Sequence, residues 1–259
     1  MKALRRIYTF LIYLFLYAPI IILIVFSFNE SSSKTKFTGF SLKWYKELIS
    51  NPDILSALFY TLICALLSSL IATVIGTISA VGINKMRKGP KTLLMNLTYI
   101  PMLNPEIVTG VSLMLLFAFI NISQGFSTML LAHISFNIPY VIISVLPKLR
   151  QMNPHLYEAA LDLGAHPLYA FFNVVLPEIK SGIVTGFLFA VTMSIDDFVI
   201  SFFTTGNGVQ NLSTYIYTQT KTGLKPEVNA LSALMFAVML VLLSIVNSRD
   251  DSKKEPLKK

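Results

Sequence analysis

The sequence predicts an all-α membrane protein with six transmembrane helices, and three observations support this. Of the 259 residues, 54% are hydrophobic and only 13% are charged, which is about half the charged share of a soluble domain. The apolar residues gather into long runs, several of which reach the roughly 20 residues that a helix needs to cross a bilayer. The Lys and Arg residues concentrate in alternate loops between these runs.

The first apolar run follows a basic N-terminal segment. It is longer than the core of a secretory signal, which has about 7–15 residues, so we expect it to remain as a span. Pro101, Pro105 and Pro139 lie within or near spans. They predict kinks rather than span ends, because membrane helices tolerate such breaks where neighbours satisfy the freed carbonyls. The predicted spans cover residues 10–28, 57–83, 96–120, 128–146, 182–204 and 229–246.

The distribution of basic residues predicts the orientation of the chain. The N-terminus, the loops 84–96 and 147–181 and the C-terminal tail together carry 15 of the 21 Lys and Arg residues. Because cytoplasmic loops are enriched in these residues, both termini are expected in the cytoplasm. We expect one membrane domain over residues 1–248 and a disordered cytoplasmic tail over 249–259. Because the basic residues are split among separate loops, the net charge of +8 is mostly a topology signal, and no nucleic-acid partner is expected. The expected surroundings of the spans are membrane lipid.

The sequence contains little that indicates metal or redox chemistry. Cys64 is the one cysteine, so an intrachain disulfide is excluded. His133, His155 and His166 are scattered along the chain, without the spacing of a metal site. We therefore predict no metal ligands, and we expect these side chains to be structural.

The loop 147–181 is long and has clear helix signals. Asn153 followed by Pro154 predicts a helix start, with Asn as the capping residue and Pro at the first helical position. Gly164 fits the left-handed residue that closes such a helix. Pro167 is expected to open a second short helix, over 168–176, and Pro177 to end it. The loop thus predicts two short helices joined at Gly164 on the cytoplasmic face.

This loop resembles the EAA loop of binding-protein-dependent ABC import permeases, whose pattern is EAA-x3-G-x9-I-x-LP. One position departs from the pattern, with Val174 in place of Ile. The resemblance implies the type I ABC importer permease fold, with cytoplasmic coupling helices that dock on a dimeric ATP-binding subunit. The alternative is a surface helix that packs on its own membrane domain. The matching residues are Glu158, Ala159, Ala160, Gly164, Leu176 and Pro177.

The resemblance implies a role for each of these coupling residues. Glu158 offers a carboxylate to donors on the ATPase subunit. Ala159 and Ala160 are small, so that two helices can approach closely. Gly164 makes the sharp turn that aims one helix away from the other.

Over nearly the whole chain the sequence is similar to permeases of the bacterial spermidine/putrescine importer family. This implies a multi-pass subunit of the plasma membrane that forms a polyamine pathway with a second, homologous permease and receives polyamine from an extracytoplasmic binding protein. The alternative is a related ABC importer for iron, an amino acid or another small solute. The matching stretches are 17–23, 39–45, 193–198 and 226–231.

The chain has no Gly-x4-Gly-Lys-Ser/Thr phosphate loop. ATP hydrolysis is therefore expected on a separate subunit, which binds ATP and Mg, and no cofactor is expected in this chain. We predict a transport subunit rather than an enzyme.

Three carboxylates fall within predicted spans, at Glu106, Asp196 and Asp197, and no Lys or Arg clearly does. Burying a carboxylate in hydrocarbon costs at least ~2.5–3.5 kcal/mol on insertion scales, so a passing polycation would be a suitable partner. Adjacent helical residues point about 100° apart, so at most one of the two Asp residues faces the pathway. Alternatively, the three acids pair with a partner permease or are protonated.

Other residues are weaker candidates for the substrate pathway. Phe198, Tyr140 and Tyr215 are candidate cation–π walls, with ordinary packing as the alternative. Glu227, beside the sixth span, is a candidate contact for the binding protein or the pathway mouth, with a solvated loop carboxylate as the alternative. The outer segment 29–56, which contains Trp44 and Tyr45, is expected to form an interfacial helix.

Two other functions compete with an importer subunit. An intramembrane aspartyl protease needs two carboxylates that converge on one water, and neighbours such as Asp196 and Asp197 diverge on one helix. A self-sufficient secondary transporter is disfavoured by the EAA-type loop and by the lack of an inverted sequence repeat.

Overall fold

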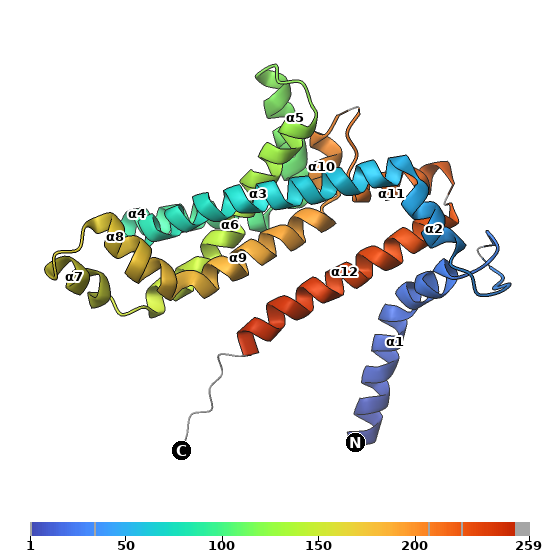
Figure 1. Ribbon diagram of the computed structural model, residues 1–259, viewed down its shortest axis with the longest axis horizontal. Coiled ribbons are helices and arrows are strands. Elements are labelled where there is room, and N and C mark those ends of the chain that lie inside the picture. Colours follow the sequence, from blue (N-terminus) through green and yellow to red (C-terminus); the bar gives the residue numbers. More distant parts are fainter. Residues whose placement is uncertain (1, 34, 207, 224, 252–259) are drawn as a thin grey trace. The chain divides into compact units, whose positions relative to one another are not determined.

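The computed structural model describes residues 2–33, 35–206, 208–223 and 225–251. Within these ranges the chain is helical apart from loops and one isolated β-bridge, between Asn29 and Phe40 (Figure 1). It divides into two compact units, Met1–Ala57 with Tyr215–Lys259, and Leu58–Thr214. In chain order the elements are α1 (Lys2–Ser27), α2 (Lys43–Ser50), α3 (Pro52–Lys85), α4 (Lys88–Leu103), α5 (Glu106–Phe119), α6 (Phe126–Gln151), α7 (His155–Asp162), α8 (Pro167–Ala170), the π-helix η1 (Phe171–Val175), α9 (Leu176–Asp196), α10 (Val199–Thr204), α11 (Leu212–Thr222) and α12 (Pro226–Asp251).

Five helical segments of the described chain are long and apolar enough to cross a membrane, and a bent pair makes six if it counts as one span. Four predicted spans correspond to α1, α3, α6 and α12. α12 continues to Asp251, past the predicted start of the tail at 249, and the rest of that tail lies outside the described residues.

The third predicted span, 96–120, is not one kinked helix. α4 and α5 meet at an angle of 102°. Pro105 disfavours helical geometry at the residue before it, and Asn104 is extended, with ψ 142°. The predicted kink is therefore a full break, and it places Glu106 in the first turn of a new helix.

The helix of the fifth predicted span, 182–204, begins earlier than the span and breaks before its end. The helical segment runs from Pro167 to Asp196, and α10 follows after a break. Pro177 does not end the second short helix, because the chain passes through η1 into α9 without interruption. The backbone N–H of Leu176 donates to the carbonyl of Phe171, five residues back. Such a wide turn accommodates the proline ring, which would clash in a regular α-helix.

The unit Leu58–Thr214 is built on α6, which packs against both α3 and α9 (Figure 1). Small residues allow the backbones to approach closely, as is usual where lipid leaves no hydrophobic force between helices. A Cβ placed on Gly182 would lie 2.9 Å from the Ser144 carbonyl oxygen, and one on Gly186 would lie 3.2 Å from Val141 Cα. The buried core at this interface includes Val141, Val145 and Ile179.

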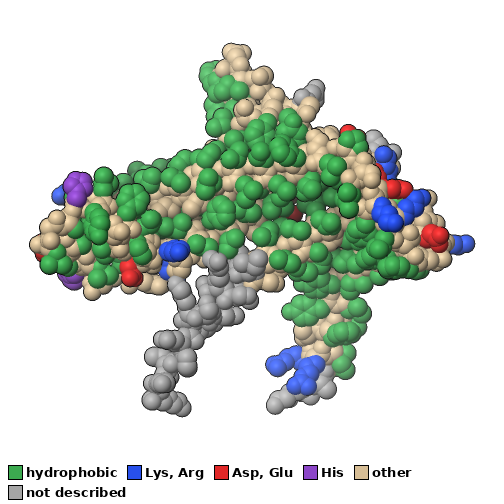
Figure 2. All heavy atoms as spheres, in the orientation of Figure 1, with side chains coloured by type: hydrophobic (Ala, Val, Ile, Leu, Met, Phe, Trp, Pro, Cys, Tyr) green, Lys and Arg blue, Asp and Glu red, His purple; other side chains and the backbone are tan. Residues whose placement is uncertain are grey.

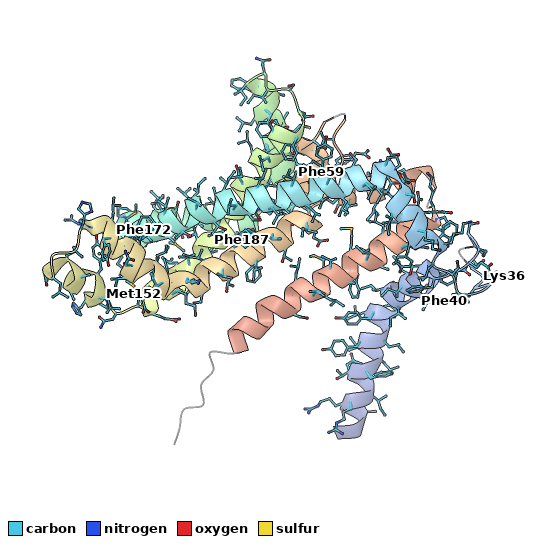
Figure 3. All side chains as sticks on the ribbon, viewed as in Figure 1. Lys36, Phe40, Phe59, Met152, Phe172 and Phe187 are labelled. Atoms are coloured by element: carbon cyan, nitrogen blue, oxygen red, sulfur yellow. The ribbon has the colours of Figure 1, made fainter. Side chains whose placement is uncertain are left out.

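The outward face of α3 carries a stripe of large apolar side chains, four residues apart along the helix. Figure 2 shows a continuous hydrophobic surface over this element, and Phe59 projects from it (Figure 3). A one-sided apolar stripe on a 34-residue helix fits contact with lipid. The stripe consists of the exposed residues Leu62, Leu66, Leu70, Val74 and Ile78.

Two glycines of α3 are expected to respond differently to alanine. A Cβ on Gly76 would lie 2.7 Å from Val141 Cβ, whereas one on Gly82 would meet nothing within 4 Å. Gly76→Ala should therefore overpack the core and cost about 1–3 kcal/mol, while Gly82→Ala should be neutral or stabilising by up to about 1 kcal/mol. Thermal unfolding in detergent measures the change in stability of each variant. Equal shifts in melting temperature for the two variants would contradict the close contact at Gly76.

In the other unit α1 and α12 are in contact, and α2 packs on α12. Lys36 and Phe40 lie in the loop between α1 and α2 (Figure 3). The predicted helix in the outer segment exists as α2, but Trp44 is buried rather than spread on a surface. Its indole N–H donates to the Asn29 carbonyl at 2.6 Å, which supplies the partner that a buried indole requires.

Candidate functional site

The α7 helix has the predicted start and stop. Asn153 Oδ1 accepts a hydrogen bond from the backbone N–H of His155 at 3.0 Å. At the other end Gly164 has a positive φ of 85°, and the N–H of Ala165 donates to the Ala160 carbonyl at 3.0 Å. This closing bond from outside the helix, next to a left-handed glycine, is a Schellman arrangement. Gly164 therefore sets the direction in which the chain leaves α7.

The segment 153–177, which we name the elbow, exposes its matched motif. α7 buries none of its residues, and Glu158 and Ala159 are exposed. Leu163 and Leu168 on either side of Gly164 are 89% and 64% exposed. Exposed apolar side chains grouped in this way indicate an interaction surface, and they disfavour a helix that only packs on its own domain. Met152 and Phe172 mark the same end of this unit in Figure 3.

The rest of the motif lies at the start of α9. Leu176 is half-buried and Pro177 is exposed. Because η1 joins α8 to α9 without a break, the elbow is continuous with a membrane helix. The arrangement links an exposed apolar surface to a span.

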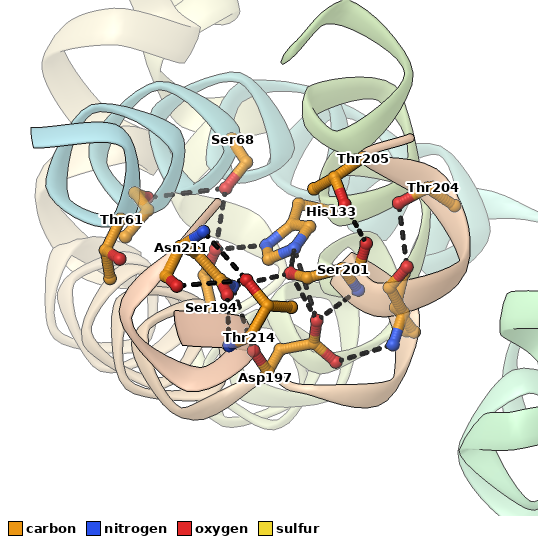
Figure 4. Close-up of polar contacts among 12 residues, drawn as sticks. Thr61, Ser68, His133, Ser194, Asp197, Ser201, Thr204, Thr205, Asn211 and Thr214 are labelled. Carbon is orange, nitrogen blue, oxygen red and sulfur yellow. Dashed lines mark hydrogen bonds and ion pairs between the residues drawn. The ribbon is translucent and has the colours of Figure 1, made fainter. Parts of the chain in front are cut away.

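Asp197 lies in a buried polar network at the break between α9 and α10 (Figure 4). Its carboxylate accepts hydrogen bonds from the backbone N–H groups of Ile200 and Ser201, at 3.2 and 2.7 Å, and from Ser201 Oγ at 2.8 Å. A carboxylate in this position caps the N-terminus of α10. His133 Nε2 of α6 lies 3.4 Å from Asp197 Oδ2, and both side chains are buried.

The network continues from Asp197 to three other helices. Asn211, just before α11, donates through Nδ2 to Ser201 Oγ at 2.7 Å and to the Asp197 carbonyl at 3.1 Å. The other ring nitrogen of His133 is hydrogen-bonded to Ser194 Oγ, which in turn lies 3.2 Å from Ser68 Oγ of α3. His133 and Ser68 therefore tie the broken segment to two unbroken helices, α6 and α3 (Figure 4).

This geometry corrects the expectation that Asp197 needs a cation from outside the chain. That expectation considered only Lys and Arg as possible partners for the carboxylate. His133, 64 positions away on another span, is the partner within the chain. Intramembrane ionisable residues usually pair with one another, and that rule pointed to this histidine. An Asp pair before an apolar stretch is also a helix-start signal, which would have located the break.

The other two predicted pathway carboxylates are exposed within this chain. Asp196 is the last residue of α9, and Glu106 is the first residue of α5. Both carboxylates thus lie at helix breaks, where backbone groups of the broken helix are also free. Tyr140, a predicted wall residue on α6, is half-buried, and its ring lies 6.4 Å from that of Phe136.

The remaining predicted residues are less accessible than expected. Phe198 is half-buried, with its ring 5.5 Å from that of Phe202. In the other unit Glu227 is 8% exposed, accepts a hydrogen bond from Asn51 Nδ2 at 3.2 Å and lies 3.8 Å from Lys225 Nζ. A solvated loop carboxylate is therefore the wrong description of Glu227.

Tyr215 is buried in the same unit as Glu227. Burial raises the pKa of its hydroxyl, and the nearby carboxylates of Glu227 and Asp53 raise it further. Its hydroxyl is therefore held in the neutral form. A neutral, buried phenol suits a structural contact, and its proposed part in a cation–π wall stays a prediction.

The comparison with known proteins agrees with these features. Residues 72–249 match the family model described as binding-protein-dependent transport system inner membrane component. The chain is 36% identical over 240 residues to the spermidine/putrescine transport system permease protein PotC of Haemophilus influenzae, covering 93% of both chains. It is 37% identical over 244 residues to PotC of Escherichia coli K12, covering 93% of this chain and 92% of that protein. It is 36% identical over 233 residues to the E. coli putrescine permease protein PotI, covering 87% and 83%.

Solved structures give the same fold. A chain of a bacterial ABC transporter that imports the acidic polysaccharide alginate superposes with a TM-score of 0.71 at 19% identity, covering 98% of this chain and 96% of that one. A chain of the MetNI methionine ABC transporter in an inward-facing conformation gives 0.59 at 18% identity, covering 82% and 97%. The described helices therefore form the type I ABC permease fold. The chain has this fold and the EAA-type elbow, and the family model matches most of the length of the chain. The chain therefore belongs to the binding-protein-dependent transport system inner membrane components.

Proposed function

We propose that this chain is the permease subunit of an ATP-driven importer and forms, with a second permease, a pathway for polyamines. The observation that carries the proposal is the 36–37% identity to spermidine/putrescine permeases over 93% of the chain. The permease function and the inner-membrane location follow from the family. The substrate is inferred from these relatives and from the chemistry of the helix breaks.

The charges at the two breaks suit a polyamine. Glu106 follows the C-terminal end of α4, and Asp196 ends α9. Helix C-termini carry partial negative charge from free carbonyl groups, and discontinuous membrane helices of transporters bind cations in this way. A polyamine offers several ammonium groups on flexible methylene spacers. Carboxylates at separate breaks would bind its charges one at a time.

We further propose that the elbow docks on a dimeric ATP-binding subunit, which binds ATP and Mg, and that an extracytoplasmic protein delivers the polyamine. Exposure of Glu158 and Ala159 beside apolar Leu163 supports such docking. The elbow lies in a loop set that carries 15 of the 21 Lys and Arg residues, which supports cytoplasmic termini. No nucleic-acid partner is proposed.

Reconstitution tests the proposal. Proteoliposomes with both permeases, the ATPase subunit and the binding protein should take up labelled spermidine or putrescine only when ATP is supplied. Asp196→Asn should lower uptake about tenfold, the factor that corresponds to 1.4 kcal/mol of lost interaction, while the complex still assembles. Glu47→Gln is the control, because this partly exposed residue of α2 makes only a loose ion pair with Lys43 at 3.7 Å.

Two results would contradict this function. Uptake that continues after ATP is depleted would indicate a secondary transporter. ATP-dependent uptake of iron or an amino acid, without polyamine uptake, would indicate the related importer that the sequence leaves as the alternative.

A further inference from the structure

A cavity lies behind the α7 helix, and the proposed transport cycle assigns it no ligand. Its volume is about 770 Å³. The ends of α3 and α6, together with α7 and η1, line it. Leu149, Phe171 and Val175 form an apolar wall, and Lys85, Arg150 and Glu158 contribute charged groups. The lining therefore combines a hydrophobic side with ionic groups.

The basic groups of this cavity are not neutralised within the described chain. Lys85 Nζ lies 4.4 Å from the centre of the Tyr157 ring, and among the described residues neither Lys85 nor Arg150 has a carboxylate within 4.0 Å. Lys91 Nζ donates to the carbonyl of Asn84, another lining residue, at 3.3 Å. Glu158 contacts His155 at 3.3 Å. The lining thus holds two cations and one carboxylate, and that carboxylate already has a partner.

The position of the cavity indicates which class of ligand fits it. α3 ends at Lys85 and α6 ends at Gln151, so the cavity lies where two spans leave the membrane. Basic pockets between membrane helices at the cytoplasmic side suit anionic lipid headgroups, and a guanidinium binds two phosphate oxygens at once. Among the matched motif residues Glu158 lines the cavity, whereas Ala159, Ala160 and Gly164 are not part of its lining and stay available to the ATPase subunit.

We infer that this cavity binds an anionic phospholipid, with its phosphate at Lys85 and Arg150 and an acyl chain along the Leu149, Phe171 and Val175 wall. The inference rests on the cytoplasmic orientation of the elbow in the proposed function, but not on the transported substrate. Such a lipid would support α7 from behind, where no protein side chain fills the space.

The test measures lipid retained by the intact complex. The transporter, with both permeases and its ATPase subunit, is equilibrated in membranes of phosphatidylcholine and phosphatidylglycerol, extracted in mild detergent, and analysed for bound lipid by mass spectrometry. The double variant Lys85→Gln, Arg150→Gln should retain about tenfold less phosphatidylglycerol, because the charged groups that hold phosphate oxygens are gone. Leu161→Trp, which fills the cavity without changing charge, should have the same effect.

A matched control removes two charges elsewhere. Lys36→Gln with Lys46→Gln, in the segment 29–56, should retain as much phosphatidylglycerol as the unmodified chain. Equal retention by all variants would overturn the inference. Binding of labelled inorganic phosphate to lipid-free complex, lost in the double variant without any change in retained lipid, would assign the cavity to a soluble anion instead. Loss of the ATPase subunit with unchanged lipid would assign it to a protein contact.

Discussion

Asp197→Ala should destabilise the chain by about 3–5 kcal/mol, because several buried donors lose a charged acceptor at once. The substitution removes the cap of α10 and the carboxylate that lies beside His133 Nε2. It also removes the acceptor of the Ser201 hydroxyl, which connects the carboxylate to Asn211. Thermal unfolding of the purified chain in detergent should show a large fall in melting temperature.

Asp196→Ala is the matched control for this experiment. The two residues are adjacent and chemically identical, but Asp196 is exposed at the end of α9. Its removal should leave the melting temperature close to that of the unmodified chain and lower polyamine uptake. Equal loss of stability in both variants would show that Asp197 has no special structural role, and normal uptake by Asp196→Ala would remove Asp196 from the pathway.

The difference between these two residues shows why only part of the site could be predicted from sequence. The start and stop of α7 depend on bonds that reach two to five residues, from Asn153 to His155 and from Ala165 to Ala160. Local chemistry fixes such features, so Asn153 and Gly164 were predicted correctly. The partner of Asp197 depends on how α6 packs against the broken span, and no local pattern contains that information.

The helix boundaries, too, could be predicted only in part from local sequence patterns. Apolar runs located the spans, because the bilayer demands a fixed length. Proline was a weaker guide, since its effect depends on the turn around it. Pro105 follows an extended Asn104 and lies at a 102° break, whereas Pro177 follows a π turn and interrupts nothing. Burial of Glu227 depends on Asn51, from a distant segment of the chain, and was likewise outside the reach of local patterns.

Glu158→Arg should uncouple ATP hydrolysis from transport. Glu158 is exposed on a helix that buries none of its own residues, so the variant should fold normally. Within the chain the reversal costs only about 0.3–1 kcal/mol, from a basic group in the first turn of α7. Across the proposed interface, loss of one partner of a hydrogen-bonded charge pair costs about 2–5 kcal/mol. Uptake should therefore fall at least about tenfold, while the isolated ATPase subunit keeps its basal turnover.

Glu178→Arg isolates the contribution of the elbow. Glu178 is also an exposed carboxylate, near the start of α9, so its reversal makes the same charge change. It lies outside the Glu158-Ala159-Ala160 segment that we propose to dock. Co-purification should show the ATPase subunit retained by Glu178→Arg and weakly held by Glu158→Arg. Equal retention and equal uptake by the two variants would mean that charge on this side of the protein, rather than a specific carboxylate on α7, attracts the ATPase subunit.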